Sequence, residues 1–282
     1  MSPYILLFVL VLLVLARPLL YKKVSMTLDH DSGPIFTAVW VLIGLVLVFP
    51  LYGHLLTGAL SDLKSNYLLL SLLVLKGGLL WFLFYNGQAL TRQSLSAAKF
   101  VLPTALGFIA IINSFLGEVL EIKEWVAALG LCALGIVFSL RGHLQELGNK
   151  GRFLFFKLVM TSIVTATLDF IILKETNWYV LLFITNLLML FICVLRRNSL
   201  SLWKNALFRK ETMFAGSVFS AGELLKFYLM VSVIPMTVVI SAQVSIIPVV
   251  LILSAVLWGE RGWKEQLLWG VLSVILLLLL FL

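Results

Sequence analysis

Apolar runs separated by short polar stretches divide this chain into ten segments. A helix needs roughly 20 residues to cross the hydrocarbon core of a bilayer, and most of the runs approach that length. The runs do not alternate apolar and polar positions as the strands of an outer-membrane barrel do, so we expect helices. The ten predicted transmembrane helices cover residues 3–21, 34–56, 67–90, 95–116, 124–140, 153–173, 178–195, 212–233, 237–257 and 264–282. They leave no room for a soluble domain. The sequence therefore predicts an all-α membrane protein.

Composition agrees with the pattern, because 62% of the residues are hydrophobic and only 12% are charged. The net charge of +8 could suggest a nucleic-acid partner, but the cations mostly lie in short loops, so we expect none. The first run lacks a basic leader and a cleavage site and is expected to be a membrane helix. Cys132 and Cys193 lie inside apolar runs, far in sequence from any residue that would complete a metal site. We expect no metal, no cofactor and no redox chemistry.

The loop cations predict an orientation. Loops after helices one, three, five, seven and nine hold 13 Lys and Arg residues, against three in the loops between them. Since cytoplasmic loops are enriched in Lys and Arg, we predict that the odd loops are cytoplasmic. Both termini would then lie outside a cell (inner) membrane that the chain crosses many times.

Short motifs recur at about half the chain length. Their offsets lie between 141 and 145 residues. The pairs are Leu116-Gly117-Glu118 with Trp258-Gly259-Glu260, Phe84-Tyr85 with Phe227-Tyr228, Lys123-Glu124 with Lys264-Glu265, and Pro103 with Pro248. We therefore predict two five-helix repeats, 1–145 and 146–282. Because five is odd, the second repeat is inverted, and in transporters of this design the substrate lies at the repeat interface near the bilayer midplane.

A proline in the fourth helix of each half, then Gly-Glu, a short turn and a glycine-containing fifth helix resemble the EamA-like family of the drug/metabolite transporter superfamily. The glycines are Gly130, Gly135 and Gly270. The opening Met-Ser-Pro-Tyr-Ile and the four-helix core also look like the small multidrug resistance proteins.

The resemblance covers essentially the whole chain and implies a ten-helix transporter, but it is nearly silent about the substrate. Members carry amino acids, nucleotide sugars, sugar phosphates, choline, vitamins and drugs. The spacing departs from a strict repeat, because Pro103 lies 15 residues before Glu118 and Pro248 lies 12 before Glu260. Many members are expected to keep both termini in the cytoplasm, and here we follow the loop charges instead.

Three charged residues lie deep inside predicted helices. An ionisable side chain at the bilayer centre costs at least about 2.5 to 3.5 kcal/mol, so it should face a cavity or a partner. Lys76, Glu223 and Lys226 are near the middle of helices three and eight, and the repeat offset places Lys76 on the face that Glu223 and Lys226 share. We predict that all three line a substrate-binding cavity. The alternatives are an ion pair that only fastens the halves, or a Glu223 that exchanges protons and couples transport to the proton gradient.

Further cavity candidates lie on neighbouring helices. Helix four carries Lys99 and Asn113 on one stripe, helix nine carries Gln243, and Trp81 offers an aromatic contact, although the face it shares with Tyr85 is also typical of helix packing. Lys99 could equally snorkel to the interface. Arg17 and Asp169, each five residues from a flanking lysine, are expected to snorkel.

Two further expectations concern turns and hinges. We predict hinges at Pro103 and Pro248. Glu118 and Glu260 are expected to cap helix starts or to pair with Lys123 and Lys264.

The predicted function is a secondary active transporter working by alternating access. A mostly cationic cavity favours a small polar or amphipathic metabolite that is anionic or zwitterionic. The alternatives are a flippase for a lipid-linked phosphate or sugar carrier, and an exporter of cationic drugs that uses aromatic residues such as Trp40 and Trp81. We do not expect an enzyme, because only His30, between Asp29 and Asp31, hints at a catalytic cluster. The expected partners are a small-molecule substrate and the lipid bilayer, with the protein a monomer or a homodimer through helices five and ten.

Overall fold

The computed structural model describes residues 3–28, 31–115, 119–140, 148–196, 200–232, 236–260 and 263–281, and within these ranges the chain is helical and has no strand. The predicted all-α fold is thereby confirmed. The helices are α1 (Pro3–Thr27), α2 (Ser32–Ser65), α3 (Tyr67–Gln93), α4 (Leu95–Phe115), α5 (Ile122–Leu140), α7 (Gly148–Glu175), α8 (Trp178–Leu195), α9 (Leu200–Phe208), α10 (Lys210–Ser232), α11 (Met236–Ser245), α12 (Ile247–Trp258) and α13 (Trp263–Phe281). Glu118, Asp29 and His30 lie outside the described residues.

Seven helices of the described ranges are long and apolar enough to cross a membrane: α1, α2, α3, α4, α5, α7 and α8. The chain is therefore compatible with a multi-pass membrane protein. α10 has 23 residues but carries Lys210, Glu211, Glu223 and Lys226. Its charges, two of them deep in the helix, set it apart from an ordinary lipid-facing span.

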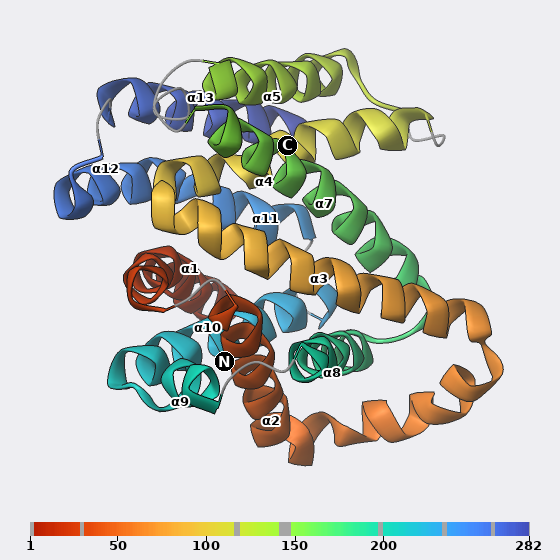
Figure 1. Cartoon of the computed structure of the whole chain (residues 1–282). Coiled ribbons are helices and arrows are strands. Elements are labelled where there is room, and N and C mark those ends of the chain that lie inside the picture. The colour runs from red at the N-terminus through yellow and green to blue at the C-terminus, as the bar shows by residue number, and fades with distance from the viewer. Residues whose placement is uncertain are drawn as a thin grey trace.

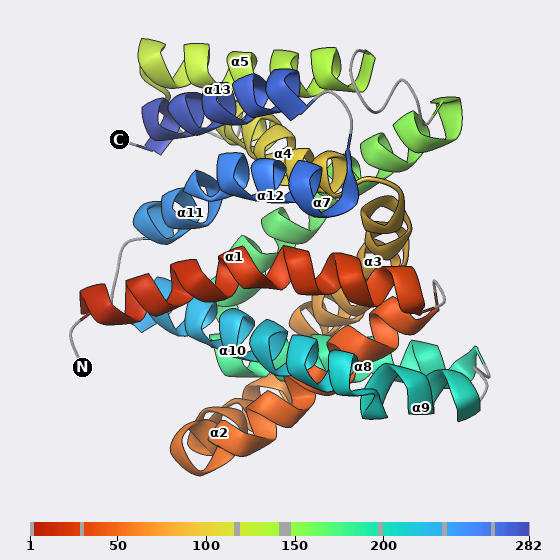
Figure 2. The ribbon, with the colours of Figure 1, turned by 90° about the vertical axis from the view of Figure 1, so that its left-hand side faces the viewer.

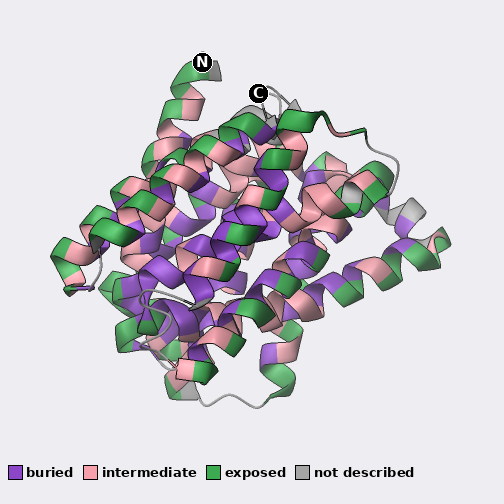
Figure 3. Ribbon diagram, turned by 90° about the horizontal axis from the view of Figure 1, so that it is seen from above, coloured by how far each residue is buried: buried purple, intermediate pink, exposed green. Residues whose placement is uncertain are grey.

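The helices are stacked in layers. α5 and α13 pack together at one edge, α2 and α8 pack together at the opposite edge, and the other long helices lie between them (Figures 1 and 2). The N- and C-termini lie at the same end of the bundle, and the short α9 lies at the other end (Figure 2). Buried residues gather in the middle of the bundle and exposed residues on its outer helices (Figure 3).

The middle helices contact each other in matching pairs. α1 packs against α10 and α7 packs against α3. α10 also contacts α2, while α3 contacts α8; α4 packs on α5, while α11 and α12 pack on α13. Each of these contacts therefore has a counterpart in which the two halves of the chain have exchanged places.

Two glycines allow the helices around the middle layer to approach closely. A Cβ added at Gly44 of α2 would collide with Ser220 of α10, and one at Gly77 of α3 would lie 2.7 Å from the Leu188 Cβ of α8. Small residues at helix contacts let the backbones of membrane helices come together and gain van der Waals packing. These contacts fix α3 and α10, which carry Lys76 and Glu223.

The predicted segment 237–257, in which a hinge was expected at Pro248, is divided into two helices. α11 ends at Ser245 and α12 begins at Ile247, with Pro248 in the first turn of α12. A proline has no backbone N–H, so it fits a first turn but removes a hydrogen bond from a helix interior. Pro103, in contrast, lies inside a continuous α4.

Candidate functional site

A cavity of about 470 Å³ lies among α1, α2, α3, α4, α7, α8, α10, α11 and α12. Both halves of the chain contribute to its wall. Six charged side chains line it, namely Arg17, Lys76, Lys99, Asp169, Glu223 and Lys226. An ionisable residue inside a membrane-spanning bundle marks a functional site by default, because its cost must be offset by a partner or by water. This cavity is therefore the candidate site.

Glu223 is held between two cations. Its carboxylate forms an ion pair with Arg17 of α1, and its other oxygen lies 2.5 Å from the Lys226 Nζ, one turn along α10. The Arg17 guanidinium also lies over the Phe219 ring, 3.8 Å from the ring centroid. Such planar stacking and charge pairing both suit arginine in a water-poor site. Glu223 is thus positioned by its two cationic neighbours.

Lys76 has a different partner from the one expected. It pairs with Asp169 of α7 and not with Glu223, and only 3% of Lys76 is exposed. The two ion pairs join matching helix contacts: Lys76–Asp169 links α3 to α7, and Arg17–Glu223 links α10 to α1. Their polarity is reversed, because the cation lies on α3 in one contact and on α1 in the other.

Most of the predicted site residues meet at this cavity. Lys76, Lys99, Gln243, Glu223 and Lys226 all line it. Trp81 is not among the lining residues. It stacks on Tyr85 with 5.3 Å between ring centroids, and the Arg196 guanidinium lies 4.6 Å from its ring. The side chain of Asn113 lies outside what the structure describes.

Arg17 and Asp169 were expected to snorkel, and that prediction is wrong. α1 continues to Thr27, beyond the predicted end at residue 21, so Arg17 lies deeper than its spacing from Lys22 suggests. Lys22 is itself only 3% exposed. The need of Lys76 for a carboxylate was the one sequence signal that could have identified Asp169 as its partner.

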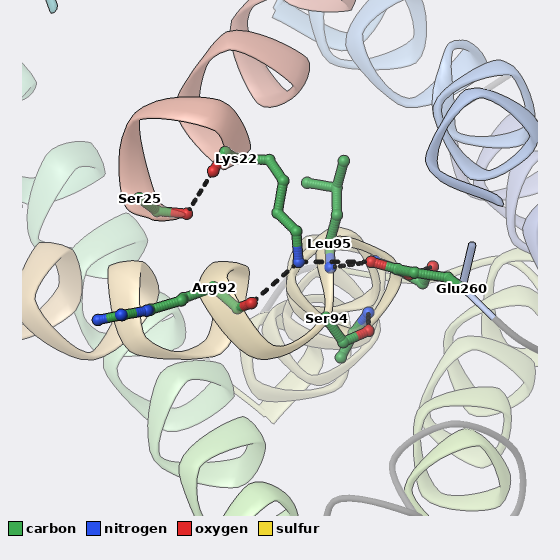
Figure 4. Close-up of polar contacts among 8 residues, drawn as sticks. Lys22, Ser25, Arg92, Ser94, Leu95 and Glu260 are labelled. Atoms are coloured by element: carbon green, nitrogen blue, oxygen red, sulfur yellow. Dashed lines mark hydrogen bonds and ion pairs between the residues drawn. The ribbon is translucent and has the colours of Figure 1, made fainter. Parts of the chain in front are cut away.

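A second polar cluster joins the end of α1, the α3–α4 junction and the residues after α12 (Figure 4). The Glu260 carboxylate accepts hydrogen bonds from the Leu95 N–H (2.8 Å), the Ser96 N–H (3.2 Å) and the Ser96 hydroxyl. The Lys22 Nζ lies 3.6 Å from Glu260 and donates to the Arg92 carbonyl at 3.0 Å. The expected role of Glu260 as a cap is thus correct in kind, but the capped helix is α4. Lys22 takes the place of the expected Lys264 as the cation beside Glu260.

The environment of Glu260 lowers its pKa. Burial opposes ionisation, but the hydrogen bonds from Ser96 and Leu95 and the charge of Lys22 outweigh it, so the pKa of Glu260 lies below its ordinary value. A carboxylate at the N-terminus of α4 also interacts favourably with the helix dipole. Because Leu95 lines the cavity, this cluster stands at one margin of the candidate site.

In the described ranges no three His, Cys, Asp or Glu side chains are grouped to hold a metal ion. Cys132 and Cys193 are buried and free. A scan of the chain against protein-family models finds no match, and a search of curated proteins finds none.

Proposed function

We propose that this protein is a secondary active transporter that moves a small polar or amphipathic metabolite by alternating access. One observation carries the proposal: six charged side chains from both halves of the chain line a single cavity inside an apolar helical bundle. A purely structural protein would gain little from this arrangement, because buried ion pairs add little net stability after desolvation. A binding site between the two halves is the usual design of such transporters.

The charge balance of the cavity favours an anionic or zwitterionic substrate. Four lining side chains are cationic, Arg17, Lys76, Lys99 and Lys226, against the two carboxylates of Asp169 and Glu223. A cavity lined mostly by one sign of charge raises the local concentration of the opposite sign. Export of a cationic drug is less well supported, because Arg17 already occupies the face of Phe219 and neither Trp40 nor Trp81 lines the cavity.

The architecture we propose is ten membrane helices in two inverted repeats, 1–145 and 146–282, of the EamA-like kind. The matching helix contacts and the reversed ion pairs support this proposal. So does the position of both termini at one end of the bundle, since an even number of crossings returns the chain to its starting side (Figure 2). The outer faces of α5 and α13 expose Leu129, Ile136, Leu268 and Ile275, and fit lipid or a second protomer.

The test is transport by the purified protein in liposomes, with labelled phosphorylated, carboxylated and quaternary-amine solutes and a lipid-linked phosphate. We expect uptake of a carboxylated or phosphorylated solute, and a loss of at least about tenfold with Lys76→Ala, because a charged contact to a bound anion contributes roughly 1.5 to 3 kcal/mol. The control is Lys174→Ala, which removes an exposed lysine outside the cavity.

Several outcomes would change the proposal. Lipid-linked phosphate moved to the exclusion of the solutes would make the protein a flippase, and no transport of any compound would overturn the proposal. Proton coupling through Glu223 predicts that uptake depends on a pH gradient in the wild type and not in Glu223→Gln. Uptake that ignores both pH and this substitution would exclude coupling.

A further inference from the structure

Lys99 differs from the other cations of the cavity in its partners. Arg17 and Lys226 pair with Glu223, and Lys76 pairs with Asp169. Lys99, on α4, lines the same cavity and forms no ion pair with any carboxylate in the described residues. Arg17 is within electrostatic reach of Lys99 and adds to the positive potential there. A cation without a counter-charge in a water-poor site is costly, so this part of the cavity favours an anion.

Two hydroxyls in the cavity wall also lack partners. The Tyr21 and Thr37 hydroxyls are buried and make no hydrogen bond within the described part of the chain. Both residues line the cavity, and Thr37 is 1% exposed. Tyr21 follows Arg17 by one turn of α1, and its ring contacts Phe36, the residue before Thr37. Buried hydroxyls are nearly always hydrogen-bonded in proteins, so two orphaned ones in residues that line one cavity point to a missing acceptor.

We propose that Lys99, together with the Tyr21 and Thr37 hydroxyls, binds the oxyanion group of the substrate, a carboxylate or a phosphate. An ammonium and two O–H groups are all hydrogen-bond donors, and an oxyanion offers only acceptors. Hydrogen bonds between charged groups are the strong ones, so Lys99 would supply most of the affinity and the hydroxyls the orientation. This inference rests on the proposed transport function, whose substrate class it narrows.

The wall beside this site leaves room for a ligand at Gly87 of α3. Gly87 lines the cavity, and a Cβ added there meets nothing within 4 Å. Gly78, on the same helix, has the same open space but does not line the cavity. Both glycines lie inside a helix, where a leucine raises helix propensity by a similar amount. Gly87→Leu and Gly78→Leu are therefore a matched pair, in which only Gly87→Leu places a new side chain in the cavity.

The test measures anion binding to the purified full chain, without transport. The melting temperature is followed in detergent as inorganic phosphate or acetate replaces chloride at constant ionic strength. We expect either anion to raise the melting temperature of the wild type, and Lys99→Gln to need at least tenfold more of it for half the effect. Lys99→Arg should respond because it keeps the charge. Lys157→Gln, which removes an exposed lysine outside the cavity, should match the wild type. Gly87→Leu should respond weakly and Gly78→Leu normally.

The outcomes separate the two proposals. Equal responses of wild type and Lys99→Gln, or no response of the wild type to either anion, would overturn the anion site even if the protein transports a solute. A Lys99-dependent response without transport in liposomes would keep the site and remove the transport function. A comparison of the protein in phosphatidylglycerol nanodiscs and in phosphatidylcholine nanodiscs tests whether the anion is a lipid headgroup or a soluble compound. Stabilisation by phosphatidylglycerol that depends on Lys99, with no effect of free phosphate or acetate, would make the ligand a lipid headgroup and overturn the assignment to a soluble substrate.

Discussion

Glu260 joins three helix ends through one carboxylate. It caps the start of α4 through the backbone of Leu95 and Ser96, and it lies beside Lys22, whose ammonium also donates to the Arg92 carbonyl in the last turn of α3. Ser94 caps the same helix a second time by accepting from the Ala97 N–H at 3.1 Å. Since Glu260 is 8% exposed, water cannot easily replace these interactions. We expect this residue to stabilise the margin of the cavity at Leu95.

The lowered pKa of Glu260 makes its contribution depend on pH. A carboxyl whose native pKa lies below its unfolded value, about 4.3 for Glu, stabilises the fold fully above that pH and loses the effect as pH falls through the native pKa. Glu260→Gln should therefore cost about 1 to 3 kcal/mol at pH 7. The gap from wild type should narrow below about pH 4.

Thermal unfolding between pH 3 and pH 7 measures this gap, with Glu265→Gln, an exposed carboxyl in the first turn of α13, as the control. A gap that keeps its size at every pH would assign the effect to packing and not to charge.

The depth of Lys76, Glu223 and Lys226 inside apolar runs was enough to predict that they line a cavity, because an apolar neighbour needs no polar partner and a charged side chain does. The partners themselves come from distant segments, and periodicity carries no information about them. The end of α1 shows the physical reason. Lys22 resembles a residue at the membrane surface, but Glu260 and the Arg92 carbonyl satisfy its charge inside the fold, so the helix continues to Thr27. Arg17 was consequently assigned to the interface.

At the scale of elements, the length of the apolar runs predicted where most helices lie. It did not predict α9 or the division between α11 and α12. α9 is a nine-residue helix between α8 and α10 that is too short to stand out in the sequence. The break between α11 and α12 was predicted as a bend at Pro248, and the structure instead ends one helix and starts another. The offset of 12 residues from Pro248 to Glu260, against 15 from Pro103 to Glu118, was the sequence sign that the two halves differ here.

Pro248→Ala tests whether this break serves motion. The substitution restores a backbone N–H and removes the ring that clashes in a helix interior, so α11 and α12 are free to join into a stiffer helix. If the break is a hinge for alternating access, the transport rate in liposomes should fall several-fold while the melting temperature stays equal or rises. The control is Pro50→Ala, which removes a proline inside α2 that does not line the cavity and should leave the transport rate unchanged. An unchanged rate for Pro248→Ala would leave the break as a packing feature.

At the scale of the whole molecule, the two halves make matching helix contacts, yet they are not copies. α2 contacts α3 extensively, while its counterpart contact of α8 with α10 is slight. The two ion pairs of the cavity lie at matching contacts, and in both of them the first half of the chain supplies the cation and the second half supplies the carboxylate. A relative movement of the two halves would therefore separate opposite charges.

The orientation of the whole chain is open to a direct test. Cytoplasmic loops collect Lys and Arg, and the odd loops hold 13 of them against three in the even loops. α9, which carries Lys204, lies at the end of the bundle opposite both termini (Figure 2).

In a background in which the buried Cys132 and Cys193 are replaced by alanine, we expect a membrane-impermeant maleimide to label Lys123→Cys in intact cells and to leave Lys204→Cys unlabelled. Both lysines are exposed in the structure, so a lack of labelling reports sidedness and not burial. The opposite result would put both termini in the cytoplasm, as expected of many EamA-like proteins, and would mean that the loop cations of this chain serve anion binding or lipid contact instead of setting topology.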